Sequence, residues 1–371
     1  MKLFWLFCIF LLSLIPLSAQ TPCGDLATQN GKWVQTPPTG KDVQAIKNIN
    51  TAMSLFQRSV TGFTGGQAKT YTFTADLVDV PGKKFQGYTA AMLFLQYECI
   101  KGVIKPEAAT DTWLYIGFNE FPFFRSNNIV GILQNCAEGF YCLPNEQQMY
   151  LSNYLLKDTF KGYPKLTPLH DPAAEAVFLS KSGRLPLRSV SEAEFLVEYK
   201  KSINQKKGEF IKNLENHLAK EPADLARMDA DKQMAGREES KKALIAANNQ
   251  TRATVAKLKN ELKACNARID SYMTTPSAKK PALIDVVDEY CVPEELFKPK
   301  SRSRTVVVFD ENYFDKKLPA ASPQFIVVYW RKGDANYELK KGVYRFPIKR
   351  EFIRKFEENF DFEALNKMLV K

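Results

Sequence analysis

The sequence predicts an α+β protein in which an antiparallel, β-rich body carries a long central antiparallel helical hairpin. Residues 191–275 are rich in charge, contain one proline and place apolar residues at helical spacing. On both sides the chain changes to aromatic and β-branched runs broken by Pro and Gly, which are typical of strands and turns. A short connection makes two helices antiparallel neighbours, so we expect Val190 and Thr275 to lie close together. The segments before and after the hairpin would then share one body.

The first 19 residues have the organisation of an export signal. Lys2 supplies the positive start, residues 3–17 form an apolar run, and Ala19 completes a small-x-small pattern. The run is shorter than the roughly 20 residues needed to span a bilayer. No later stretch is long and apolar enough to span one. The sequence therefore predicts an exported protein, periplasmic or secreted, without a transmembrane segment in its mature chain.

The expected organisation has four parts. They are a signal peptide at 1–19, an N-terminal α+β domain at 20–190, the coiled-coil-like hairpin at 191–275, and a C-terminal β-rich segment with closing helices at 276–371. In the second part we expect a helix at 42–60 with Asp42 as its N-cap. Strands are expected there at 70–80, 88–100 and 112–121, and short helices at 146–158 and 171–179. In the last part we expect strands at 305–309, 324–331 and 337–346, and helices at 349–356 and 361–369.

The hairpin begins with a capping-box sequence, Ser191 followed by Glu194. The first helix then places a stripe of apolar residues on one side: Phe195, Tyr199, Ile203, Phe210, Leu214 and Leu218. We expect it to end near Pro222, before a less regular piece that runs to Gly236.

The second helix is predicted from Arg237 to Met273, with an apolar seam toward its C-terminal end. Steps of three and four residues, as in a coiled coil, join Val255, Leu258, Leu262, Cys265, Ile269 and Tyr272. Extended backward, the seam meets Thr251, Asn248 and Leu244 and becomes more polar. Strong packing is therefore expected at the base. A functional surface is expected at the looser far end, at residues 222–236.

Three segments resemble sequence patterns of a group of uncharacterised exported proteins of Gram-negative bacteria. They read GRLPLRSVSEAEFL at 183–196, YFDKKLPAASPQF at 313–325 and NFDFEAL at 359–365. The resemblance covers the C-terminal half of the chain. It implies export and the strand-helix layout, and it transfers no catalytic residue.

Six cysteines remain after the expected cleavage: Cys23, Cys99, Cys136, Cys142, Cys265 and Cys291. An even number in an exported chain permits three disulfide bonds. A local bridge between Cys136 and Cys142 would close a short loop, and Cys265 could tie the hairpin base to Cys291 or to Cys99. No metal site is predicted, because CxxC is absent and neither His170 nor His217 has a second ligand at metal-binding spacing.

The charge pattern and the absence of several catalytic motifs argue against several function classes. The net charge of +11 is spread evenly, because basic residues exceed acidic ones by three, three and four in 20–190, 191–275 and 276–371. Nucleic acid is therefore not an expected partner. The chain lacks GxSxG, HExxH, GxxxxGK[ST] and GxGxxG, so no cofactor and no catalytic residue is predicted.

Three functional hypotheses follow. The first is a non-enzymatic exported binding or scaffold protein whose hairpin offers a surface to a protein partner. The second is a small-ligand or glycan binder that uses Trp113, Tyr115 and Phe118 as an aromatic platform, although such residues more often belong to a core. The third is a hydrolase with a carboxylate site, for which Asp310/Glu311 and Asp285/Asp288 are candidate pairs.

Overall fold

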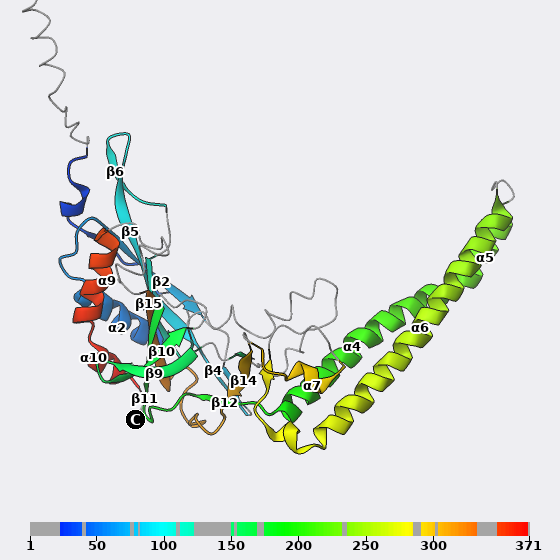
Figure 1. Ribbon diagram of the computed structural model, residues 1–371. Helices are drawn as coiled ribbons and strands as arrows, with labels where there is room; N and C mark the ends of the chain where they lie inside the picture. Colours follow the sequence, from blue (N-terminus) through cyan, green and yellow to red (C-terminus); the bar gives the residue numbers. More distant parts are fainter. Residues whose placement is uncertain are drawn as a thin grey trace, which may run out of the picture.

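The computed structural model is an α+β protein, a β-rich body from which a helical hairpin projects (Figure 1). It describes residues 23–38, 42–74, 78–80, 82–108, 112–121, 150–151, 154–168, 174–231, 236–284, 291–300, 303–331 and 347–369. The expected export signal, the expected Cys136–Cys142 bridge and the expected strand at 337–346 lie outside the described residues.

The body is organised around a nine-stranded sheet in the described part of the chain. Its order is β1-β2-β5-β7-β15-β11-β10-β9, with β6 added to β5. The strands are β1 (Lys32–Val34), β2 (Gly66–Thr74), β5 (Tyr88–Ile100), β6 (Val103–Pro106), β7 (Thr112–Phe118), β9 (Tyr154–Phe160), β10 (Tyr163–Pro168), β11 (Ala174–Ser180) and β15 (Phe325–Arg331). Only β1 and β2 pair in parallel among these neighbours. Because β15 lies between β7 and β11, the N- and C-terminal segments share one sheet, as predicted.

Three helices cover one face of this sheet: α2 (Val43–Ser59), α9 (Pro347–Asn359) and α10 (Phe362–Asn366) (Figure 1). The Asp42 side chain accepts a hydrogen bond from the Ala45 N–H at 2.9 Å, which confirms the predicted N-cap. The rings of Phe94 on β5 and Phe352 on α9 stack with centroids 4.2 Å apart. The helices and the sheet thus enclose the main hydrophobic core.

A smaller sheet joins the body to the hairpin. Its order is β12-β14-β13, and β8 also pairs with β14. These strands are β8 (Tyr150–Leu151), β12 (Leu187–Ser189), β13 (Leu283–Ile284) and β14 (Arg304–Phe309). Because side chains alternate along a strand, Val306 packs into the core at the hairpin base while Val307 packs into a second core on the body. One strand therefore contacts both parts of the molecule.

In the described residues, the hairpin consists of α4 (Glu192–Leu218), the shorter α5 (Glu221–Ala230) and α6 (Arg237–Met273). The predicted capping box is present, since the Ser191 hydroxyl accepts from the Glu194 N–H and the Glu194 carboxylate accepts from the Ser191 N–H. Burial raises the pKa of Glu194, but hydrogen bonds from Ser191 and Arg188 outweigh it, so the net shift is downward. The ionised Glu194 carboxylate is thereby favoured at the N-terminus of α4.

The remaining short elements are connections. They are η1 (Leu26–Thr28), the two-stranded ribbon of β3 (Val78–Val80) and β4 (Lys83–Phe85), η3 (Pro276–Lys279) and α7 (Pro293–Leu296). The ends of the hairpin meet as predicted, because the Ala282 N–H donates to the Val190 carbonyl and the Glu192 N–H donates to the Lys280 carbonyl, both at 2.8 Å.

Two predicted helices are wrong. Residues 171–179 contain β11, and residues 146–158 contain β8 and most of β9. The Ala- and Glu-rich start of β11 favours a helix locally, but β11 lies between β15 and β10 and is buried along its length. Burial between two strands overrides the local preference.

A buried ion pair joins α9 to the segment after β6. The Lys349 ammonium lies 2.7 Å from the Glu107 carboxylate, with 1% and 3% of the two side chains exposed. The Gln96 N–H donates to the same carboxylate at 2.9 Å. Each charge is therefore compensated inside the protein.

Replacing Lys349 with Met would leave the Glu107 carboxylate buried without its ammonium partner. We expect the free energy of unfolding, measured by chemical denaturation, to fall by about 3–5 kcal/mol. Lys367→Met is the matched control, because the Lys367–Glu363 pair is exposed on both sides. It should leave the stability nearly unchanged. Similar losses in the two variants would contradict the role given to the buried pair.

Candidate functional site

The base of the hairpin is held by apolar packing. Phe195, Tyr199 and Ile203 of α4 pack with Cys265 and Ile269 of α6 in a core that also includes Val306 of β14. The hairpin therefore begins as a continuation of the folded body rather than as a loop attached to it.

A buried polar contact closes the base. The Tyr272 hydroxyl donates to the Glu192 carboxylate at 2.6 Å. Burial raises the pKa of Tyr272, and the Glu192 carboxylate raises it further, so the hydroxyl keeps its proton and remains a donor. This bond joins the first turn of α4 to the last turn of α6.

Two disulfide bonds lie among the described cysteines. Cys265 of α6 bonds to Cys291, which was one of the two partners predicted for it, with Cα atoms 4.8 Å apart. Cys23 bonds to Cys99 of β5, with Cα atoms 5.8 Å apart. The first bond ties the hairpin base to the segment that leads into α7.

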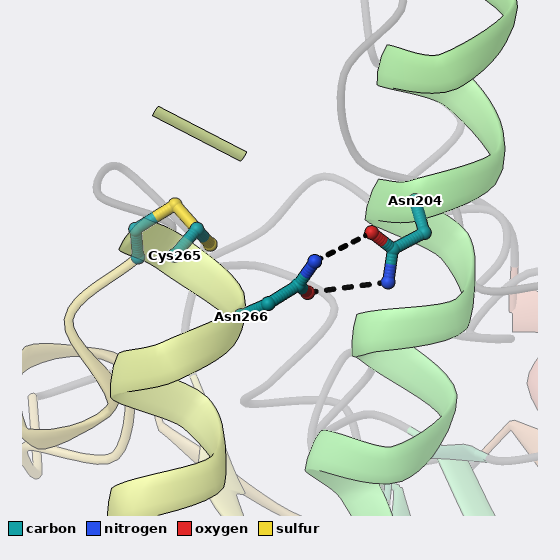
Figure 2. The surroundings of a disulfide bond; sticks show 4 residues. Asn204, Cys265 and Asn266 are labelled. Atoms are coloured by element: carbon teal, nitrogen blue, oxygen red, sulfur yellow. Dashed lines mark hydrogen bonds between the residues drawn. A yellow bond between two sulfur atoms is a disulfide. The ribbon is translucent and has the colours of Figure 1, made fainter. Parts of the chain in front are cut away.

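Just beyond the base, two asparagine side chains join the helices. Asn204 of α4 donates to Asn266 of α6 at 3.1 Å, and Asn266 donates back at 2.7 Å, next to the Cys265 disulfide (Figure 2). Both side chains are half-buried. A reciprocal amide pair requires one longitudinal and rotational alignment of the two helices, so it specifies their register.

Ion pairs cross the interface on both sides of the asparagine pair. Lys200 contacts Asp270 at 2.5 Å on the base side of the asparagines, and Lys259 contacts Glu215 at 2.6 Å beyond them. Arg252 then contacts Glu221, and Lys241 contacts Asp229 at 2.5 Å near the far end. From the base to the tip, successive pairs use higher residue numbers in α4 and α5 and lower ones in α6. The antiparallel helices therefore stay aligned as far as the tip.

The far end has little apolar packing of its own. Asn248 is 2% exposed and occupies the position predicted for it in the seam of α6, and Thr251 and Leu244 are half-buried there. At the tip, the hydrogen bond from Lys241 lowers the pKa of Asp229, so this pair stays ionised at neutral pH. Toward the tip, directional polar contacts therefore accompany a few buried apolar side chains such as Val255.

The seam of α4 differs from its prediction at one position. Phe210 is 44% exposed, whereas Ile211 is 5% exposed. The row of buried and half-buried apolar residues along α4 therefore has a spacing of eight residues from Ile203 to Ile211. Leu214 follows Ile211 after three residues, and Leu218 follows after four more. In a helix of 3.6 residues per turn, a spacing of eight residues shifts this row to a neighbouring part of the helix surface. Sequence spacing alone was compatible with either position 210 or position 211.

The described part of the piece predicted to be less regular is helical as far as Ala230. Pro222 lies in the first turn of α5, where its missing N–H leaves no hydrogen bond unmade. Ala219 and Lys220 keep right-handed helical dihedrals, so α5 follows α4 after a short break. In the described part of the chain, α5 packs mainly on α6, and Figure 1 shows the pair projecting away from the body.

The aromatic platform is present in part. Trp113 lies in ring contact with Tyr71 of β2 at a centroid distance of 5.3 Å, with Phe73 at 6.3 Å and with Tyr115 at 5.4 Å. Tyr115 in turn contacts Tyr329 of β15. Burial raises the pKa of Tyr115 and leaves its hydroxyl protonated. Phe73 is the most exposed ring of this aromatic face, at 45%.

Phe118 was predicted in the platform and does not belong to it. It is fully buried and stacks on Tyr88 at 4.9 Å, within the core under the helices. Side chains alternate along β7, so Trp113 and Tyr115 share one face while Phe118 points to the other.

The candidate carboxylate pair at the end of β14 is engaged in local structure. Asp310 accepts from Arg184 at 3.1 Å and from the Asn312 N–H at 3.0 Å. Glu311 pairs with Lys316 at 3.2 Å. Each carboxylate has its own cationic partner, so the two do not form a coupled acid and base.

The other chemical candidates give no site in the described residues. Asp285, Asp288 and His170 lie outside these residues, and His217 is exposed in the last turn of α4. Among the residues that the structure describes, no three potential ligands gather to hold a metal ion. Within the same residues, no helix has both the length and the hydrophobicity that crossing a membrane requires.

Comparison of the chain with protein-family models, with curated proteins and with solved structures finds no match.

Replacing Asn204 with Ala would leave the half-buried Asn266 amide without its cross-helix partner. We expect the hairpin to lose about 1–2 kcal/mol of local stability, seen as faster amide hydrogen exchange in α4 and α6 with unchanged exchange in the body sheet. Gln205→Ala is the matched control, because the Gln205 amide bonds only to Glu209 of the same helix among the described contacts. Equal effects of the two substitutions would contradict the register role.

Proposed function

We propose that the protein is an exported, non-enzymatic binding or scaffold protein whose distal hairpin is the surface for a protein partner. The distal hairpin comprises residues 212–231 and 236–261. One observation carries the proposal. This part projects from the body and packs mainly within itself in the described chain, while the body is complete without it (Figure 1).

The size of the projection supports this inference. At about 1.5 Å per residue, residues 237–261 alone extend roughly 38 Å. The disulfide, the asparagine pair and the ion pairs hold this length in one alignment. A rigid extended surface loses little conformational freedom when it binds, which favours recognition of another macromolecule.

Export is supported by two disulfide bonds, since such bonds persist in oxidising compartments. The mixed charge of the distal hairpin, largely neutralised by its own ion pairs, favours a protein partner over nucleic acid.

The aromatic face is a second candidate, for a glycan or another small ligand with a flat apolar side. The observation in its favour is that Tyr71, Phe73 and Trp113 contact one another on the sheet face opposite the helices. Rings in this arrangement offer stacking surface of the kind that binds sugar faces.

Shortening the hairpin tests the leading proposal. Residues 213–260 are replaced by a short glycine-rich turn, which keeps Ile211, Leu262, the asparagine pair and the disulfide. We expect the shortened protein to keep the melting temperature of the body and to lose the partner that the full-length protein retains. The partner is captured with a photo-crosslinking amino acid that replaces Ala226, which is exposed on α5. The control carries the same amino acid in place of Ser54, which is exposed on α2.

In the full-length protein, crosslinks from position 226 and none from position 54 are the expected result. The shortened protein, which lacks position 226, should fail to retain the partner in a pull-down. A partner captured equally by the shortened protein would overturn the proposal. If that capture were lost in Phe73→Ala at an unchanged melting temperature, the binding surface would be the aromatic face.

A further inference from the structure

A two-stranded arm extends the sheet beyond its neighbouring strands. Pairing of β5 with β2 ends at Gln96, and the next four residues of β5 pair with β6 instead. We call residues 97–106 the arm. Its turn consists of Lys101 and Gly102, with φ of 52° and 78°. Positive φ at both central residues is the tight hairpin turn that matches the twist of the strands. Figure 1 shows the arm, labelled β6, leaving the body at a different place from the hairpin.

The tip of the arm is apolar and exposed. Ile100, Val103 and Ile104 are 43%, 53% and 38% exposed. Ile100 lies directly opposite Val103 on one face, and Ile104 lies opposite Cys99 on the other. Aliphatic side chains thus lie on both faces at the end of the arm. Among the residues that the structure describes, those of the arm do not belong to the main hydrophobic core.

The fold nevertheless holds this tip in place. An isolated two-stranded hairpin is marginally stable in water. Here the turn fixes the register, and the Cys23–Cys99 disulfide ties the arm to the segment before η1. Three neighbouring aliphatic side chains on this covalently supported tip thus form a small exposed apolar patch.

The chemistry of the arm argues against strand pairing with a second copy. Its outer strand, β6, reads Val-Ile-Lys-Pro and is exposed along its length. Lys105 and Pro106 are residues that block edge-to-edge pairing, since proline lacks the N–H and two copies would bring like charges together.

An anionic lipid surface fits the same features. The charged groups of the arm are Glu98, Lys101 and Lys105; the two lysines outnumber the single carboxylate, and Lys101 lies in the turn at the tip. We propose that the arm tip inserts Ile100, Val103 and Ile104 into the surface of an anionic phospholipid bilayer, with Lys101 and Lys105 at the head groups.

Such contact is peripheral, because three aliphatic side chains reach only into the head-group boundary. Binding of the tip to the bilayer depends both on burial of the aliphatic side chains and on the charge of the lysines. Substitutions can remove each contribution separately. The proposal is independent of the hairpin's role, because the arm and the hairpin share none of their residues.

The test uses the full mature chain and vesicles of phosphatidylcholine with or without phosphatidylglycerol, scored by co-sedimentation. We expect binding only with phosphatidylglycerol. Ile100→Ser with Val103→Ser should weaken the partition coefficient by about tenfold or more. Ile245→Ser is the matched control, because Ile245 is 40% exposed on the hairpin, and it should leave binding unchanged.

A second variant separates charge from folding. Lys101→Asn keeps the positive φ that the turn needs, since asparagine tolerates it. Combined with Lys105→Gln, it should weaken binding by about fivefold for each lysine removed and abolish most of its salt dependence. The near-ultraviolet circular dichroism and the Cys23–Cys99 bond should be unchanged in both variants.

Absence of wild-type binding to phosphatidylglycerol vesicles would overturn the proposal, as would equal losses in Ile245→Ser. Self-association that depends on Ile100 and Val103, without vesicle binding, would likewise overturn it and assign the tip to a second copy of the chain.

Discussion

Successive side chains of strand β14 pack into two different hydrophobic cores, one at the base of the hairpin and one on the body. Val306 lies in the core formed by α4 and α6, and Val307 lies in the core formed with the large sheet. A shift of the register by one residue would exchange the two cores, so pairing with β12, β13 and β8 is strongly specified. The orientation of the hairpin relative to the body therefore depends on this strand.

From that base the hairpin changes in character along its length. Apolar packing and the Cys265 disulfide hold its first turns, the asparagine pair follows, and ion pairs extend to the tip. Exposed ion pairs contribute little net stability, but they penalise misaligned helices. The ion pairs of the distal hairpin thus fix the alignment of its helices more than they add to its stability. Its outer surface remains available for recognition.

Sequence patterns predicted the parts that depend on local periodicity. The seam of α6, the capping box at Ser191 and the N-cap at Asp42 each follow from spacing within one element. The errors arose where tertiary packing decides. β11 is a strand because two neighbours bury it, and Ile211 replaces Phe210 because the row of buried apolar residues along α4 shifts around the helix. The arm tip escaped prediction because exposure of Ile100 depends on where β2 ends.

The most direct test of the account is the distance between the hairpin and the body. Spin labels attached through bio-orthogonal side chains at Ala226 on α5 and Ser54 on α2 leave the native cysteines intact. Electron–electron double resonance would then report the spread of distances. If β14 holds both cores at once, the distribution is a single narrow peak. A broad or multiple distribution would show that the hairpin swings about its base and would contradict the account.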